Sequence, residues 1–382
     1  MEWRVPLTDL DYGEAEIAAV TEVIKSRWLT MGEITQEFEM EFGAMCGAKH
    51  AVALSNATEA LHLACLALEI GPGDEVIVPS LSFVATANAV LYCGAKVKFA
   101  DILSPNELTI DPSAIKQAIN EKTKAIIVMH YAGYPCRMDE ISGIAAEYNL
   151  PIIEDAAHAS GSFLKGKGLG CLGDIGCFSF FSNKNLSVGE GGMLVCERDD
   201  IAETVRLLRS HGMTSMTYDR HQGHAFSYDV VKTGYNYRID EIRSSLGLVQ
   251  LKKLEKNNKK RGELTQRYWN AFRDHGFGQP FSHLLQGQFS YHIFPLMLPS
   301  DINRKEFMTK LRDAGIQTSI HYRPIHTFTN YRDKNKGAWL PITDYAGGRE
   351  VTLPLFPTMT DEQQDYVIEN VIRVIKLAKG KE

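Results

Sequence analysis

The chain has 382 residues, of which 44% are hydrophobic and 23% charged, values typical of a globular protein with about two or three domains. This composition excludes a disordered chain, a collagen and a coiled coil. Lys and Arg total 41 against 47 Asp and Glu, a formal net charge of −6, so the dense basic surface that binds nucleic-acid phosphates is not expected.

The chain alternates strand-like and helical segments up to about residue 200. Near-continuous Val and Ile runs predict strands that are buried on both faces. Amphipathic segments lie between them, so the pattern predicts βαβ units and a mainly parallel sheet. The expected strands are 51–55, 75–80, 96–101, 124–130, 150–157, 174–181 and 192–197, and the expected helices are 58–68, 83–93, 111–119 and 137–148.

After about residue 200 the pattern changes. Helices are expected over 199–212, 239–275, 303–315 and 361–380, with strands over 289–298 and 317–322. The prediction is therefore an α/β protein with a three-layer α/β/α large domain over 1–250, which includes an N-terminal helical segment. A smaller C-terminal α+β domain is expected over 251–382.

The cysteines and the beginning of the chain bear on its compartment. The seven cysteines are scattered, with no C-x-x-C pair, which predicts free thiols in a reducing compartment and neither a disulfide framework nor a metal site. The first residues carry acids where a signal peptide would be basic. The uncharged window 76–95 contains Pro79 and several polar residues, so we expect a strand and a helix there and no membrane span. The expected location is the cytoplasm.

One glycine motif favours a different function. Residues 168–173 match G-x-G-x-x-G, the dinucleotide fingerprint of an oxidoreductase. That motif works at the beginning of a helix, because the helix N-terminus holds the pyrophosphate. Here a strand-like run, 174–181, follows the glycines. A sugar-nucleotide oxidoreductase therefore stays only a remote alternative.

A second group of residues suits pyridoxal 5'-phosphate (PLP). This cofactor needs a lysine that forms a Schiff base with its aldehyde and a carboxylate that faces its ring nitrogen. Lys184 follows the strand-like run 174–181, and Asp155 ends the run PIIED. The segment 55–58 ends a strand and begins a helix, as a phosphate site does. Phe83 follows another strand and could cover the ring. Each residue taken singly also fits an ordinary structural role.

Several long strings resemble the DegT/StrS family of PLP-dependent sugar aminotransferases, which have the aspartate-aminotransferase fold (fold type I). The strings begin at residues 55, 153, 173, 189 and 234; they are SNATEALHLACLALEIGPGDEVIVPSLSFVATANAVLYCGAKVKFADI, IEDAAHASGS, GDIGCFSFFSNKNL, GEGG and GYNYRIDEI. The resemblance covers roughly residues 5–380 and is densest over 50–250.

The resemblance implies a role for each matching position. It makes Lys184 the Schiff-base lysine and Asp155 the partner of the ring nitrogen, while Phe83 stacks on the ring. His158 would lie near the cofactor's 3-oxygen, and His321 would line the substrate end. The phosphate would be bound by the backbone at Ala57, Thr58 and Glu59, by the Ser179 hydroxyl, and by Asn236 of a neighbouring subunit in a homodimer with shared sites. The chain departs from the family at Ser182–Asn183 and at Leu81–Ser82.

The expected function is transfer of an amino group from an amino acid, L-glutamate, to a keto-sugar carried on a nucleotide, in amino-sugar biosynthesis. Two alternatives share the fold. A sugar dehydratase has a histidine in place of the lysine, and a non-catalytic regulator lacks the lysine or the aspartate. The presence of Lys184 and Asp155 disfavours both. We expect specificity to depend on the loops 213–233 and 321–340.

Overall fold

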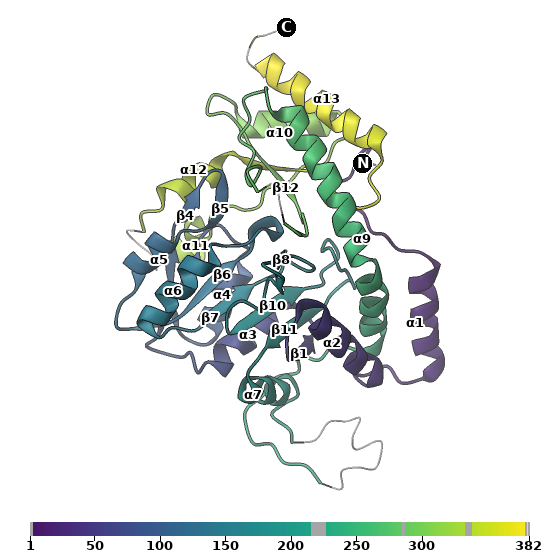
Figure 1. Cartoon of the computed structure of the whole chain (residues 1–382), viewed down its shortest axis with the longest axis vertical. Coiled ribbons are helices and arrows are strands. Elements are labelled where there is room, and N and C mark those ends of the chain that lie inside the picture. Colours follow the sequence, from purple (N-terminus) through teal and green to yellow (C-terminus); the bar gives the residue numbers. More distant parts are fainter. Residues whose placement is uncertain (1–2, 215–226, 285–286, 333–337, 379, 381–382) are drawn as a thin grey trace.

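The seven strands expected in the first 200 residues form one seven-stranded sheet in the computed structural model (Figure 1). The structure describes residues 3–214, 227–284, 287–332, 338–378 and 380. Strand β11 runs antiparallel to both of its neighbours, and every other neighbouring pair is parallel, which confirms the mainly parallel α/β fold. The order across the sheet is β1 (His50–Leu54), β11 (Gly192–Cys196), β10 (Ile175–Ser179), β7 (Ile152–Asp155), β6 (Thr123–Met129), β2 (Glu75–Pro79), β3 (Lys96–Ala100).

Helices cover both faces of this sheet, as the alternation of buried side chains requires. Val52 and Leu54 of β1 belong to a core shared with one set of helices, whereas Ala51 and Ala53 belong to a core on the opposite face. The first set is α3 (Ala57–Ala67), α4 (Ala85–Tyr92) and α7 (Asp199–Arg209). The second face is covered by α2 (Glu33–Cys46), α5 (Pro112–Ala118) and α6 (Met138–Tyr148). The result is the three-layer arrangement.

A separate core, rich in aromatic residues, lies mainly in the second half of the chain and also includes Leu81 and Tyr131 of the first half. It contains Tyr268, Phe272, Phe294 and Phe307 and is enclosed by the elements that follow the sheet. These elements are the C-terminal part of α9 (Glu241–Phe272), β12 (Phe294–Met297), α10 (Arg304–Asp313), β13 (Glu350–Leu353) and α13 (Asp361–Ala378); η2 (Ile325–Thr327), α11 (Thr329–Arg332) and α12 (Pro341–Arg349) precede β13.

The prediction of a strand over 317–322 is wrong. This segment makes only an isolated bridge, between Ser319 and Thr352, and the partner of β12 is β13, which the sequence analysis did not identify. The backbone amide of His321 donates to the Glu350 carboxylate (2.8 Å) and not to a neighbouring strand. A side chain therefore replaces the sheet hydrogen bond at this position.

Helix α9 passes through the expected boundary between the two domains. Its first turns pack against α1 (Glu14–Ser26) and α2, and its last turns pack against α13 (Figure 1). Because no break occurs at residue 250, we propose that the domains 1–250 and 251–382 share α9 as a rigid connection.

Short elements complete the chain. The pair β4 (Ile102–Ser104) and β5 (Glu107–Ile110) forms one two-stranded sheet, and β8 (Phe163–Leu164) and β9 (Lys167–Gly168) form another; η1 (Tyr131–Gly133) follows β6. The window 76–95 forms most of β2 together with α4. Within the described residues, no helix has the length and apolar character needed to cross a membrane. The seven cysteines are free.

The glycine motif at 168–173 surrounds a buried carboxylate. Backbone amides of Gly170, Leu172 and Gly173 donate to the Glu154 carboxylate over 2.7, 2.6 and 2.5 Å, and Glu154 is also hydrogen-bonded to His130 (2.7 Å). Strand β10 follows these glycines, not a helix. The motif therefore binds a side chain of its own domain, which removes the basis for the oxidoreductase alternative.

Candidate active site

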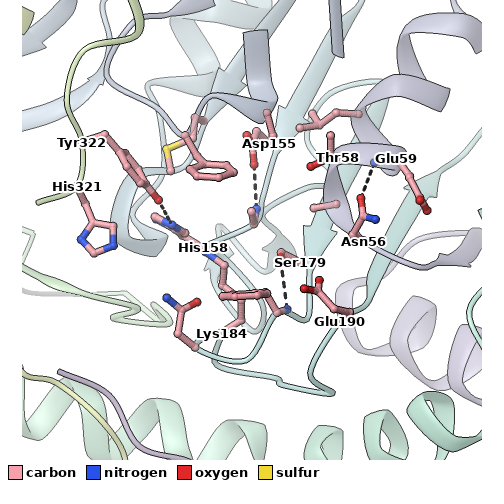
Figure 2. Close-up of a pocket in the computed structure, with 18 of the residues that line it drawn as sticks. Asn56, Thr58, Glu59, Asp155, His158, Ser179, Lys184, Glu190, His321 and Tyr322 are labelled. Atoms are coloured by element: carbon pink, nitrogen blue, oxygen red, sulfur yellow. Dashed lines mark hydrogen bonds between the residues drawn. The ribbon is translucent and has the colours of Figure 1, made fainter. Parts of the chain in front are cut away.

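Parallel strands end at the same edge of the sheet, and a cavity of about 690 Å³ lies there. Every site residue predicted from the sequence lines this cavity except Asn236. Figure 2 shows the side chains that converge on it. The lining residues are Asn56, Ala57, Thr58, Glu59, Leu61, Phe83, Ala85, Tyr92, Met129, Asp155, Ala157, His158, Ser179, Phe181, Asn183, Lys184, Glu190, Tyr237, His321 and Tyr322.

One end of the cavity is the N-terminus of α3. Asn56 caps this helix by accepting the Glu59 amide at its Oδ1 (2.9 Å, Figure 2), so the Glu59 amide is already occupied. The amides of Ala57 and Thr58 have no acceptor among the described residues, as expected for the first helical turn. Two free N–H groups at the positive end of a helix form a site for an anion such as a phosphate.

Gly192 and Ser179 complete this end. A Cβ atom at Gly192 would lie 2.4 Å from the backbone carbon of Asn56, so only glycine lets β11 approach the beginning of α3 this closely. The Ser179 Oγ atom, at the end of β10, accepts the Phe181 amide (3.3 Å, Figure 2). Its own hydroxyl proton is left to donate into the cavity.

The carboxylate of Asp155 faces the cavity from the end of β7 and is only 3% exposed. Thr86 donates to its Oδ2 (2.7 Å), and the Ala157 amide donates to its Oδ1 (3.2 Å, Figure 2). The Ser82 Oγ and Thr86 Oγ1 atoms are 2.6 Å apart. Because the Thr86 hydroxyl gives its proton to Asp155, the Ser82 hydroxyl must donate to Thr86. Burial raises the pKa of Asp155, and no ion pair with it occurs among the described residues. A cationic group in the cavity would stabilise this buried charge.

Lys184 follows β10 in a turn whose Lys184 amide donates to the Phe181 carbonyl (2.8 Å). Burial lowers the pKa of its amine to about 8, although the nearby Asp155 carboxylate acts in the opposite direction. A lysine with this pKa is partly in the free-amine form near neutral pH, the form that attacks a carbonyl carbon.

His158 is held in one tautomer beside Tyr322. The Ala132 amide donates to His158 Nδ1 (3.2 Å), and His158 Nε2 lies 2.7 Å from the Tyr322 hydroxyl (Figure 2). Burial lowers the pKa of His158 well below its usual value, so the ring is neutral and its proton is on Nε2. His158 therefore donates to Tyr322, whose own proton is available to the cavity.

His321 lies at the other end of the cavity, 9% exposed. His321 Nδ1 lies 2.7 Å from Thr352 Oγ1, and Thr352 Oγ1 in turn donates to Glu350 (2.5 Å). Burial lowers the pKa of His321 to about 3, which keeps the ring neutral. Its place in the cavity agrees with the expected position at the substrate end, while its role stays a prediction.

Phe83 and Asn236 have contrasting positions. Phe83 is 56% exposed although it is a large apolar side chain, and its exposed surface lines the cavity. A flat ligand would cover it.

Asn236 is exposed, forms an isolated β-bridge with Ser210 and does not line this chain's cavity. Its contact with a neighbouring subunit stays a prediction.

Together these groups fit PLP. The free amides of α3 and Ser179 suit the phosphate, the unpaired Asp155 carboxylate suits the ring nitrogen, and Phe83 offers a flat apolar face. Three residues that contact these groups were not predicted from the sequence: Tyr322 contacts His158, Thr86 contacts Asp155, and His292 contacts Lys184. Only Tyr322 had a local signal, since it directly follows His321. Thr86 and His292 reach the site through the fold. The described residues hold no cluster of His, Cys, Asp and Glu suited to a metal ion.

Known proteins resemble the chain along its whole length. The model of the DegT/DnrJ/EryC1/StrS aminotransferase family matches residues 10–372. The chain is 40% identical over 372 residues to the spore coat polysaccharide biosynthesis protein SpsC of Bacillus subtilis (strain 168), with 95% of each chain covered.

Two solved structures share the fold. One is PseC of Helicobacter pylori, an aminotransferase involved in the biosynthesis of pseudoaminic acid, with 30% identity, a TM-score of 0.90, and 99% of this chain and 100% of that chain covered. The other is NtdA of Bacillus subtilis with bound cofactor PMP, with 32% identity, a TM-score of 0.86, and 97% and 83% covered.

Proposed function

The chain belongs to the DegT/DnrJ/EryC1/StrS aminotransferase family, and from this premise we propose that it moves the amino group of L-glutamate to the keto group of a nucleotide-linked deoxysugar. It is a PLP-dependent sugar aminotransferase, like its relatives in amino-sugar biosynthesis. The nucleotide and the glutamate donor are the parts that we propose.

The observation that carries the proposal is the pairing of Lys184 with Asp155 in one cavity. Lys184 supplies an amine with a pKa of about 8, and Asp155 supplies a buried carboxylate that makes no ion pair among the described residues. A dehydratase of this family lacks the lysine, and a regulator lacks one of the two. No observation favours either alternative.

We assign cofactor binding to the predicted residues. Ala57 and Thr58 would donate their backbone amides to the phosphate, and Ser179 would donate its hydroxyl proton. Glu59 shapes the helix turn because its amide donates to Asn56. Phe83 would cover one face of the ring, and His158, neutral and fixed by the Ala132 amide, would lie beside the ring oxygen. When bound, PLP supplies an aldehyde that condenses with amines and a ring that withdraws electrons from the carbon beside the nitrogen.

The chain's own residues handle the protons. As a free amine, the Lys184 Nζ atom would accept the proton of the donor's α-carbon. As an ammonium, it would return a proton to the cofactor carbon that carried the aldehyde oxygen. Asp155 keeps its negative charge through the donors Thr86 and Ala157, and this charge holds a proton on the nitrogen that it faces. His321 stays neutral and presents an uncharged edge to the substrate.

The acceptor is proposed from the relatives and from the lining of the cavity. SpsC is a polysaccharide biosynthesis protein and PseC acts in the biosynthesis of pseudoaminic acid. Tyr92 and Tyr237 offer aromatic faces, and the Glu190 carboxylate offers an acceptor for sugar hydroxyls. The nucleotide rests on the family resemblance alone, and part of loop 213–233 and residues 333–337 of loop 321–340 lie outside the described residues.

We also propose that the enzyme is a cytoplasmic homodimer. The free cysteines are consistent with a reducing compartment. Asn236 is exposed on the chain's surface and is therefore free to enter a neighbouring subunit's site.

The test is a screen of keto-sugars, each offered with and without its nucleotide, with 15N-labelled glutamate as donor and mass spectrometry as readout. The proposal predicts a labelled amino-sugar only from a nucleotide-linked ketone, and none with the Lys184→Ala variant. Equal amination of the free sugar would refute the nucleotide. Labelled product from alanine or aspartate but not from glutamate would refute the donor.

A further inference from the structure

A buried histidine that the family comparison did not bring into the site contacts Lys184. His292 precedes β12, is 3% exposed, and its Nε2 atom lies 3.4 Å from the Lys184 Nζ atom. The His292 ring also lies beside the His158 ring, with 4.2 Å between their centres. A residue of the second half of the chain therefore contacts the amine that the first half supplies.

Asn185, the neighbour of Lys184, fixes the tautomer of His292. The Asn185 amide nitrogen donates to Asn258 Oδ1 (2.7 Å) and to the Ser290 carbonyl (2.6 Å), so both amide protons are used. Its Oδ1 must then face His292 Nδ1 over 2.8 Å and accept that proton. Burial lowers the pKa of His292 well below its usual value, so the ring is neutral and Nε2 carries only a lone pair.

We infer that His292 is a positioning residue for Lys184. Its unprotonated Nε2 atom accepts a hydrogen bond from the Lys184 amine, and this bond holds the amine at the cavity wall whenever the lysine is not bound to the cofactor. The inference rests on the proposed function of Lys184. The groups that face this amine are Asp155, His158, His292 and His321, and Arg261 also faces His292. Asp155 alone among them carries a negative charge, and His292 is the one within hydrogen-bond reach.

The acceptor should affect the protonation of Lys184 in a definite direction. Burial lowers the pKa of this lysine, and a lone pair that accepts from the ammonium opposes that effect. Loss of the acceptor should therefore lower the pKa of Lys184 below about 8. The expected shift is about one pH unit, as for one hydrogen bond to a charged group.

Two amide substitutions separate positioning from a structural role. The carbonyl of His292→Gln reaches the place of Nε2, whereas that of His292→Asn reaches only the place of Nδ1. We propose to measure the pKa of Lys184 in the full-length chain freed of cofactor, from the pH dependence of its acetylation by trace acetic anhydride, read by mass spectrometry. The control variant is His283→Asn, which replaces a half-exposed histidine outside the cavity and should leave the pKa of Lys184 unchanged.

The inference predicts that His292→Asn lowers the pKa of Lys184 by about one unit while His292→Gln keeps the parent value. Equal curves for parent and both variants, or equal shifts in both variants, would overturn it. Protection of Lys184 by added PLP in the parent tests the proposed function separately, since it does not depend on His292.

If the Asn variant does not fold, 15N NMR of histidine-labelled parent protein decides instead. The inference requires His292 to carry its proton on Nδ1. The signals of His292 are identified as those that are missing from the spectrum of the His292→Gln variant. A proton on Nε2 would overturn it, because that tautomer cannot accept from Lys184.

Discussion

Replacing Thr86 with valine removes one donor from the buried Asp155 carboxylate without changing side-chain size. Thr86 Oγ1 donates to Asp155 Oδ2 over 2.7 Å, and such a hydrogen bond to a charged group contributes about 1.5–3 kcal/mol. One pKa unit corresponds to about 1.36 kcal/mol, so the pKa of Asp155 should rise by about one to two units. Burial already raises this pKa, and the Thr86 donor acts against that effect.

The sign of the effect on activity follows. The carboxylate is lost as the pH falls through its pKa, so a higher pKa moves the limb of the pH–rate profile that belongs to Asp155 to higher pH. This limb is separate from the step near pH 8 that Lys184 gives in both proteins. The assay is the glutamate half-reaction of the PLP-loaded protein, followed by the loss of the cofactor's visible absorbance between pH 5 and 9.

Thr109→Val is the matched control. Thr109 is as buried as Thr86, but its hydroxyl has no partner among the described residues. It should leave the acidic limb in place. Ser82→Ala, which removes only the donor to Thr86, should give a smaller upward shift. If the acidic limbs of Thr86→Val and Thr109→Val coincide, the hydrogen bond does not hold the Asp155 charge and the reasoning fails.

Three further predictions follow from the same site. The half-reaction rate of the parent should rise as the pH rises through about 8, because Lys184 acts as a free amine, and a flat profile across that range would contradict this pKa. Gly192→Ala should weaken PLP affinity in an equilibrium titration, because the new Cβ atom would lie 2.4 Å from the Asn56 backbone. Gly143→Ala in α6 is the control, since open space surrounds its Cβ position and the affinity should not change. Equal affinities of the two variants would refute the steric argument. Mixed dimers of Lys184→Ala and Asn236→Asp should regain up to about half of the parent activity if Asn236 serves the neighbouring site, and none if each site is built from one chain.

The large domain could be predicted from the sequence because its signals are local. Runs such as KAIIVMH are apolar enough to identify a strand buried on both faces, and Asp111 followed by Pro112 marks the beginning of α5, where the Asp111 side chain accepts the Ser113 amide. The carboxyl ends of such strands meet at one edge of the sheet, so the strand pattern alone predicts that Asp155 and Lys184 lie together, whereas Ser179 was predicted through the family resemblance.

The small domain was harder to predict from the sequence, because the structure of its segments depends on contacts with residues that are distant in the chain. The segment 317–322 has the alternation of a strand, but its neighbour Glu350 binds the His321 amide through a side chain. Similarly, His292 lies in the strand-like run 289–298, where it resembles a core residue. Its contact with Lys184 appears only when α9 and β12 place the two halves of the chain against each other.

The role of Lys184 as the residue that binds PLP can be tested by locating the modified lysine. The protein loaded with PLP is reduced with borohydride and digested, and the peptide that carries the phosphopyridoxyl group is sequenced by mass spectrometry. We expect this group on Lys184, with none on the Lys184→Ala variant. The group on a different lysine, or none on the loaded parent protein, would contradict it.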